Sequence, residues 1–339
     1  MIVLAIETSC DETGVALLRD AGVNRPPALL ANLIASQEEL HAPFGGIVPE
    51  LASRRHLEAL PVLVERALTA ASLKKSDISG VAVTYAPGLV GALLVGVSFA
   101  KAYALALNIP FIGVHHIEGH LHAPFLEGDS LRYPFLALVV SGGHTSLYYV
   151  AGLGTYELIG ATRDDAAGEA FDKVARILGL GYPGGPLIDK ESERGDSKAF
   201  SFPRAKVGRF EFSFSGLKSS VKDAVNLQHH TNDSWLSDIC ASFQEAVVSE
   251  LVKKTIDAAA ARRCRQIVVS GGVARNRRLR QLLSEHCQRE ELQCFIPAPI
   301  LCTDNAAMIG YVGLKRLQRG ESGTLNLNAI ATVELARAG

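Results

Sequence analysis

Residues 2–20, IVLAIETSCDETGVALLRD, are typical of an apolar strand, a tight polar turn and a second apolar strand. Residues 133–152, YPFLALVVSGGHTSLYYVAG, repeat that plan around a Gly-Gly turn. Elsewhere apolar strands alternate with helical patterns, which indicates an α/β protein with mostly parallel sheets. Two halves that each open with a hairpin predict an internal duplication. We therefore expect an N-terminal lobe over residues 1–132 and a C-terminal lobe over residues 133–339 that includes the C-terminal helix.

Composition narrows the class of protein. The chain has 339 residues, of which 48% are hydrophobic and 20% charged, as in globular soluble proteins. A net charge of -1 argues against a broadly basic nucleic-acid binder, although a local basic face remains compatible with it. The six cysteines form no C-x-x-C pair, which favours reduced thiols and a cytoplasmic location. The most apolar run, residues 88–100, has 13 residues, too few to span a bilayer, so we expect no membrane association.

The segment from Gly88 to Ala106 is apolar on nearly every side of a helix. A helix without a polar face is expected to be buried all round, in a core or against a partner subunit. We expect this helix to form a subunit interface.

Four of the ten histidines lie within residues 115–123, HHIEGHLHA. In a helix, His116 and His120 stand one turn apart on one face, the spacing at which two imidazoles share a metal. Glu118 is about 200° round the helix from His116, so the metalloprotease arrangement of H-E-x-x-H does not apply. The structural alternative is a solvated helix end with surface histidines.

A metal site needs a further ligand, and the stretch ILCTDNAAMIG offers Asp304. The alternative for this residue is structural, with Asp304 or Thr303 as the N-cap of the following helix. Two histidines and one carboxylate would leave open positions on the metal, which suits Fe(II) or a catalytic zinc ion.

Two glycine turns share the sequence VVSGG, at residues 139–143 and 268–272. The second leads towards a helix that begins near Asn276, where unpaired backbone N–H groups suit a phosphate or an adenosine. An ordinary strand–helix connection is the alternative. In GEAFDKVARILGLGYPGGP, Asp172 lies off the buried stripe, at the spacing for an i,i+4 pair with Arg176. Gly185 would allow a ligand to approach the backbone closely.

Ten segments, in order along the whole chain, resemble the bacterial TsaD family, once mislabelled a glycoprotease. They are ETSCDETGVA, GGIVPELASRRH, YAPGLVGALLVGVSFAK, HHIEGHLHA, VSGGHTSL, GEAFDKVAR, GYPGGP, FSFSGLK, VSGGVARNRRLR and CTDNAAMIG. The resemblance implies the two-lobed actin, Hsp70 and sugar-kinase fold around a nucleotide cleft. It also implies transfer of threonylcarbamoyl from threonylcarbamoyl-AMP to the exocyclic amine of adenosine 37 in tRNAs that read ANN codons.

Carried over residue by residue, the resemblance assigns one divalent ion to His116, His120 and Asp304, with Fe(II) favoured over Zn. It assigns substrate contacts to Val139, Val140, Ser141, Gly142, Gly143, Asp172, Gly185 and Asn276. Ser9, Asp11 and Glu12, in the first hairpin, are expected to take phosphate or proton-transfer roles. The implied partners are tRNA, a TsaB-like paralogue, a TsaE-like ATPase and a TsaC/Sua5-type enzyme that supplies the adenylate.

Two alternatives share the expected fold. A small-molecule kinase or ATPase would use the cleft for ATP and would not need two histidines on one helix with a distant aspartate. A non-catalytic scaffold would keep the apolar helix and lack the metal ligands. The His-His-Asp group therefore discriminates against both.

Overall fold

The computed structural model describes residues 1–335 except 23–24, 129 and 228–233, in two compact units. Unit 1 comprises residues 1–131 and the described residues from Thr303 onward, and unit 2 comprises Arg132–Cys302.

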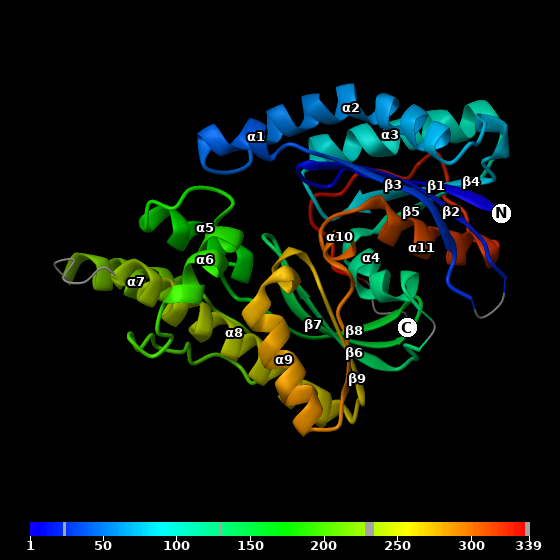
Figure 1. Cartoon of the computed structure of the whole chain (residues 1–339). Helices are drawn as coiled ribbons and strands as arrows, with labels where there is room; N and C mark the ends of the chain where they lie inside the picture. The colour runs from blue at the N-terminus through cyan, green and yellow to red at the C-terminus, as the bar shows by residue number, and fades with distance from the viewer. Residues whose placement is uncertain (23–24, 129, 228–233, 336–339) are drawn as a thin grey trace. The chain divides into compact units, whose positions relative to one another are not determined.

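Unit 1 is built on a five-stranded sheet in the order β3-β2-β1-β4-β5. Strands β1, β2 and β3 pair antiparallel, whereas β4 and β5 continue the sheet parallel to β1. Helices α2 and α3 cover one face and α11 covers the other (Figure 1). The bounds are β1 Ile2–Glu7, β2 Glu12–Arg19, β3 Ala28–Ser36, α1 Glu38–His41, α2 Pro49–Ala70, β4 Gly80–Ala86, α3 Val90–Leu107, β5 Phe111–His115, α4 His116–His122 and α11 Ala306–Gln318.

Both faces of this sheet are buried, which explains the continuous apolar run of β1. Leu4 and Ile6 pack into a core cluster with side chains of α2 and α3. Ala5, which points to the other face, lies against Gly310 of α11. A Cβ added at Gly313 would overlap the Cβ of Ala82, so the glycines of α11 allow the helix to approach the sheet closely.

Unit 2 repeats this plan with a sheet in the order β10-β9-β6-β7-β8. Strands β6, β7 and β8 pair antiparallel, and β9 and β10 continue parallel to β6. The matching topology confirms the predicted duplication. The bounds are β6 Phe135–Val140, β7 Thr145–Gly152, β8 Thr155–Ala161, α5 Ala167–Ile177, α6 Gly184–Glu191, α7 Ser215–Leu227, α8 Trp235–Arg262, β9 Gln266–Ser270, α9 Arg277–Arg289, β10 Gln293–Phe295 and α10 Pro299–Cys302.

The expected placement of the C-terminal helix in the second lobe is wrong. Helix α11 packs on β1, β2, β4 and β5, so the chain returns to the first sheet after Cys302. Sequence order suggested the opposite because nothing local marks which of two similar sheets a helix covers. The close glycine contacts of α11 with the first sheet supply the physical reason.

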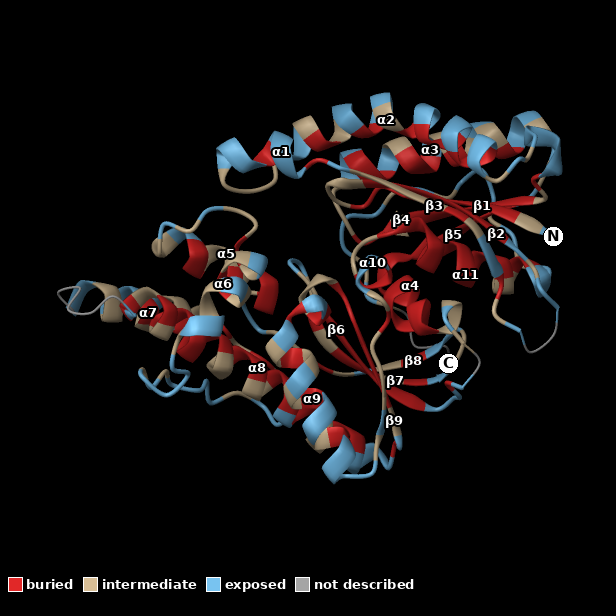
Figure 2. Cartoon of the chain, viewed as in Figure 1, coloured by how far each residue is buried: buried red, intermediate tan, exposed pale blue. Residues whose placement is uncertain are grey.

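The structure does not bury the helix after Gly88 within its own unit, which leaves burial against a partner subunit as the open alternative. Helix α3 extends to Leu107 and packs on α2 and β4, but Leu94 is 49% exposed and Leu105 is 69% exposed. Figure 2 shows exposed residues along the outer sides of α2 and α3. Within the described ranges, α3 alone is long and apolar enough to cross a membrane, by length and composition only. It includes Lys101, beyond the 13-residue run.

Candidate functional site

The structure brings His116, His120 and Asp304 together, as the sequence predicted. Their ligand atoms lie within 4.8 Å of one another. Asp304 Oδ1 is 3.2 Å from His120 Nε2 and 3.4 Å from His116 Nε2. Both histidines are buried, which rules out the alternative of surface histidines at a solvated helix end. Two imidazole nitrogens and a carboxylate oxygen converging in a buried group fit a divalent transition-metal ion.

Asp304 does not cap the helix that follows it. Helix α11 begins at Ala306, and its N-cap is Asn305, whose side-chain oxygen accepts a hydrogen bond from the Met308 N–H at 3.1 Å. The capping alternative for Asp304 and Thr303 is therefore wrong. With Asn305 as the cap, the Asp304 carboxylate faces the two histidines.

The ring of His116 is oriented by Glu7, the last residue of β1. Nδ1 of His116 lies 3.1 Å from Glu7 Oε2 and 3.1 Å from Ser9 Oγ. Since a carboxylate only accepts, Nδ1 carries a proton and Nε2 is the atom that offers a lone pair to a metal. Glu7 is itself held by the Thr84 hydroxyl and the Ser9 N–H, each at 2.5 Å.

These charges shift the pKa values within the group. Burial lowers the pKa of His116, but the carboxylates of Asp304 and Glu7 outweigh burial and raise it well above its usual value. Burial raises the pKa of Asp304, but the charge on His116 and the hydrogen bonds from both histidines hold it well below its usual range. Burial lowers the pKa of His120. A divalent cation bound by this group would replace the proton on Nε2 of His116, so its binding would release protons.

The other groups of the histidine segment have structural contacts. Glu118 lies 3.6 Å from Arg316, away from the two ligand histidines, in agreement with the argument against a protease. The His115 ring caps α4 by accepting the Ile117 N–H at 3.2 Å. His122 stacks on Phe125, and burial lowers its pKa to about 4.

Ser9 and Asp11 lie on the turn between β1 and β2, and Glu12 is the first residue of β2, all in the same unit as the metal group. Among them, the hydroxyl of Ser9 touches His116 directly. Burial, followed by the charges of Asp11 and Asp304, raises the pKa of Glu12 well above its usual value. Burial likewise raises the pKa of the Cys10 thiol, so Cys10 remains protonated.

In unit 2 the two VVSGG turns lie side by side at one edge of the sheet. Val139 of β6 pairs with Ser270 of β9, and a Cβ added at Gly271 would overlap the Val140 carbonyl. The N-terminus of α5 reaches the same place, because the Gly168 N–H donates to the Ser141 carbonyl at 3.1 Å. Side chains at Gly142 and Gly143 would meet no described atom within 4 Å, so these turns leave backbone accessible.

Two further predicted residues of unit 2, Asp172 and Asn276, have defined local roles. Asp172 accepts the Gly184 N–H at 2.7 Å, which ties α5 to the start of α6. Asn276 caps α9 through the Leu279 N–H at 2.9 Å and donates to Gln244 at 2.6 Å. A Cβ at Gly185 would meet no described atom within 4 Å, in keeping with a ligand-facing backbone.

The sequence interpretation missed Glu7 and Thr84 as supports of the metal group. A signal was present, since Glu7 is a carboxylate at the end of an apolar strand and is only 1% exposed in the structure. A buried carboxylate requires hydrogen-bond donors or a positive partner. The identity of those partners depends on the pairing of β1 with β4 and on the position of α4.

Comparisons with known proteins show the family of the chain. Residues 28–311 match the model of the family "TsaD: tRNA N6-adenosine threonylcarbamoyltransferase". The chain belongs to the tRNA N6-adenosine threonylcarbamoyltransferase family. A relative of that name from Syntrophus aciditrophicus is 50% identical over 100% of this chain and 99% of its own. Another relative of that name, from Syntrophotalea carbinolica, is 52% identical over 100% of this chain and 98% of its own.

Solved structures that share only the fold extend the comparison beyond the threonylcarbamoyltransferase family. Full-length HypF, in its phosphate- and nucleotide-bound form, is 14% identical with a TM-score of 0.61, covering 94% of this chain and 56% of HypF. Component A of the Acidaminococcus fermentans (R)-2-hydroxyglutaryl-CoA dehydratase is 16% identical with a TM-score of 0.55. The match covers 94% of this chain and 99% of component A. With the duplicated sheets, these likenesses confirm the predicted actin, Hsp70 and sugar-kinase fold.

The geometry predicts that metal binding depends on all three ligands and, more weakly, on Glu7. His116→Ala and His120→Ala should each abolish stoichiometric binding of Fe²⁺ or Zn²⁺, measured by dialysis and elemental analysis. Glu7→Gln, which removes the charge behind His116, should weaken binding by about 10–100-fold. His286→Ala, at a histidine of α9 outside the group, is the control for adventitious binding. Stoichiometric metal in the His116→Ala and His120→Ala variants would contradict this assignment.

Proposed function

We propose that this threonylcarbamoyltransferase uses threonylcarbamoyl-AMP as donor and modifies adenosine 37 of tRNAs that read ANN codons. In this reaction the exocyclic amine nitrogen bonds to the carbamoyl carbon. The bond from that carbon to the phosphate oxygen breaks, AMP leaves with the electron pair, and the amine loses a proton. The family match over residues 28–311 is the observation that carries the proposal. The donor is already activated, so the protein mainly positions and polarises it.

His116, His120 and Asp304 would hold the metal, with Fe(II) favoured because two histidines and one carboxylate with open positions are the ligand set typical of non-haem Fe(II). A divalent ion held there supplies a Lewis acid that polarises a carbonyl or phosphoryl oxygen. The chain's own residues keep His116 in the correct tautomer through Glu7 and bury the two ligand histidines away from bulk water.

We assign the AMP part of the donor to the glycine turns of unit 2. Support comes from the accessible backbone at Gly142, Gly143 and Gly185. Backbone N–H groups beside a helix N-terminus favour a phosphate. The remaining expected contacts are Val139, Val140, Ser141, Asp172 and Asn276.

Ser9, Asp11 and Glu12 are assigned to proton transfer and phosphate positioning. A carboxyl group whose pKa is raised above its usual value, as burial raises that of Glu12, is a stronger base and is suited to accept the proton that the amine loses. The hydroxyl of Ser9, in contact with His116, places this turn next to the metal ligands.

Transfer can be tested with purified protein, its assembled partners, threonylcarbamoyl-AMP and a tRNA that reads ANN codons. We expect N6-threonylcarbamoyladenosine in the digested tRNA, and no product when adenosine 37 is replaced by guanosine. Glu12→Gln should lower kcat by about 10²–10⁴-fold, the usual contribution of a general base. Phosphorylation of a small molecule by ATP without modified tRNA would favour the kinase alternative instead.

The proposed partners follow from the family. A TsaC/Sua5-type enzyme would supply the adenylate, a TsaB-like paralogue would bind as a subunit, and a TsaE-like ATPase would act on the complex. A cytoplasmic location accords with six free cysteines.

Three basic clusters are candidates for tRNA contact: Arg54 with Arg55, Arg204 with Lys206 and Arg209, and Arg275 with Arg277, Arg278 and Arg280. The structure distinguishes between the last two. In the 275–280 cluster, Arg277 pairs with Asp189 and Glu193, and Arg278 pairs with Glu245. The 204–209 cluster lies in the exposed segment before α7. There Arg204 donates to a neutral group, the hydroxyl of Ser249, at 3.2 Å. We therefore favour Arg204, Lys206 and Arg209 as phosphate contacts.

Reversing charge at this cluster should weaken tRNA binding in a salt-dependent way. Arg204→Glu with Lys206→Glu should lower tRNA affinity and reduce the slope of log affinity against log salt by about 1 for each phosphate that the variant no longer neutralises. Binding of threonylcarbamoyl-AMP should not change. The control is the same charge change at the exposed residues Arg25 and Arg289. Equal affinities and slopes in the two double variants would place the tRNA path elsewhere.

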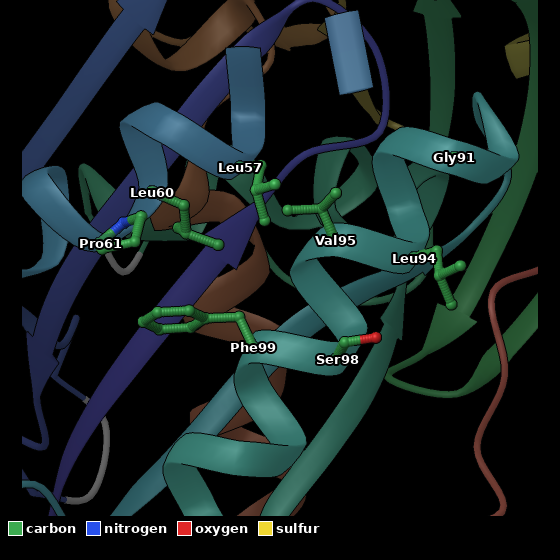
Figure 3. A pocket seen from close by; sticks show the side chains of 8 residues that line it. All are labelled: Leu57, Leu60, Pro61, Gly91, Leu94, Val95, Ser98 and Phe99. Carbon is green, nitrogen blue, oxygen red and sulfur yellow. The ribbon is translucent and has the colours of Figure 1, made fainter. Parts of the chain in front are cut away.

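An apolar groove between α2 and α3 is the proposed surface for the TsaB-like paralogue. Figure 3 shows its lining side chains, which come from both helices. They are Leu57, Leu60, Pro61, Gly91, Leu94, Val95, Ser98 and Phe99. Leu57 is 67% exposed and Leu94 is 49% exposed, which is unusual for adjacent leucines unless another surface covers them.

A charge in this groove should weaken binding of the paralogue. Leu94→Glu should lower its affinity by more than about tenfold, measured by titration, because the carboxylate would lose its hydration in the interface. Leu105→Glu is the matched control, an exposed leucine of the same helix outside the groove. Both variants should retain the thermal stability of the unmodified chain. An unchanged affinity for Leu94→Glu would show that the groove is not the interface.

A further inference from the structure

His56 of α2 is a fully buried histidine with polar contacts to both ring nitrogens. Its Nε2 lies 2.9 Å from the carbonyl oxygen of Cys10. Its Nδ1 lies 2.8 Å from the Thr13 hydroxyl and 3.5 Å from the Gln37 amide nitrogen. These contacts connect α2 to the turn between β1 and β2, at Cys10, and to the start of β2, at Thr13.

The partners of His56 determine its tautomer. A carbonyl oxygen only accepts, so Nε2 carries the proton and donates to Cys10. Nδ1 then accepts from the Thr13 hydroxyl, and a donor at Gln37 Nε2 is compatible with that assignment. Burial lowers the pKa of His56, which favours the neutral ring that this arrangement requires.

The turn that His56 contacts carries the residues next to the metal group. The Leu89 N–H, just before α3, donates to the Ser9 carbonyl at 2.8 Å. His56 donates to the next carbonyl, that of Cys10. Two successive carbonyls are thus held by groups of α2 and the α3 N-terminus. Ser9 also connects this turn to the metal ligands, because its hydroxyl is 3.1 Å from His116 Nδ1.

We infer that His56 is a positioning residue for the reaction: its Nε2–H bond to the Cys10 carbonyl fixes the β1–β2 turn so that Ser9 meets His116 and Glu12 keeps its place in the site. This inference rests on the proposed role of the metal group. His56 touches neither the metal ligands nor the substrate positions, so it acts only through the turn.

Two isosteric substitutions separate the contacts of His56. The amide nitrogen of glutamine occupies the place of Nε2 and donates to Cys10, so His56→Gln should retain the turn. The shorter asparagine matches the Nδ1 position and accepts from Thr13 but does not reach Cys10. His41→Asn is the control for removal of a buried histidine. His41 is fully buried in the same unit and contacts Gln37 and the Val48 N–H, not the turn.

Three measurements on the full chain test the inference. Hydrogen exchange of the peptide that contains Ser9–Glu12 reports the order of the turn without metal or substrate. Titration with Co²⁺ alone reports, by its visible absorption, the environment of His116. Steady-state transfer with the assembled partners gives kcat and KM for tRNA. Thermal unfolding of each variant gives the decrease in stability against which the other readouts are compared.

For His56→Asn we expect faster exchange in this peptide, a Co²⁺ affinity lowered about tenfold or more, and a kcat lowered about 10–100-fold with KM for tRNA little changed. His56→Gln should restore most of each property. His41→Asn should be destabilised to a comparable extent but keep the exchange, the Co²⁺ spectrum and kcat of the unmodified chain.

Equal effects of His56→Asn and His41→Asn on exchange, or no effect of His56→Asn, would overturn the positioning role. If the unmodified chain bound no Co²⁺ or transferred no threonylcarbamoyl group, the proposed function would fail instead. In that case the exchange comparison would still decide whether His56 orders the turn, because it requires neither metal nor substrate.

Discussion

The buried carboxylate of Glu7 is the constraint on which the site of unit 1 depends. A charge that is 1% exposed must be compensated, and three groups from different segments provide this. They are the Thr84 hydroxyl on β4, the Ser9 N–H on the turn, and His116 on α4. Because these segments follow or form neighbouring strands of one sheet, satisfying Glu7 also orients His116. Removal of any one partner would leave a buried charge undercompensated.

The third ligand reaches the site because the chain returns to its first sheet. Helix α11 lies close to that sheet through Gly310 and Gly313, where larger side chains would overlap Leu18 and Ala82. The residue before the helix, Asn305, satisfies its N-terminus. Asp304 is therefore available to His116 and His120 rather than to the backbone of α11. Packing of the α11 glycines against the first sheet thus contributes to placing Asp304 beside the two histidines.

The same duplicated plan serves different chemistry in the two units. In unit 1 the strand ends carry histidines and carboxylates, which suit a cation. In unit 2 the equivalent hairpin and the following parallel strand carry glycine turns, with Gly168 and Gly271 in close contact with the first turn. Glycine there exposes backbone N–H groups, which suit an anionic phosphate. One topology therefore supports both a metal group and a proposed nucleotide site.

The sequence by itself determined the hairpins, the duplication, the family and the pair His116 and His120, because these depend on local patterns of period 2 and 3.6 and on contiguous motifs. It did not determine that α11 covers the first sheet or that Asn305 rather than Asp304 is the cap. Nor did it distinguish the cations of α9, which pair with acidic side chains of unit 2, from those of the exposed 204–209 segment. The roles of Glu7, Thr84 and His56 were likewise decided only by tertiary structure. Each depends on contacts between residues at least 43 positions apart, which no local pattern encodes.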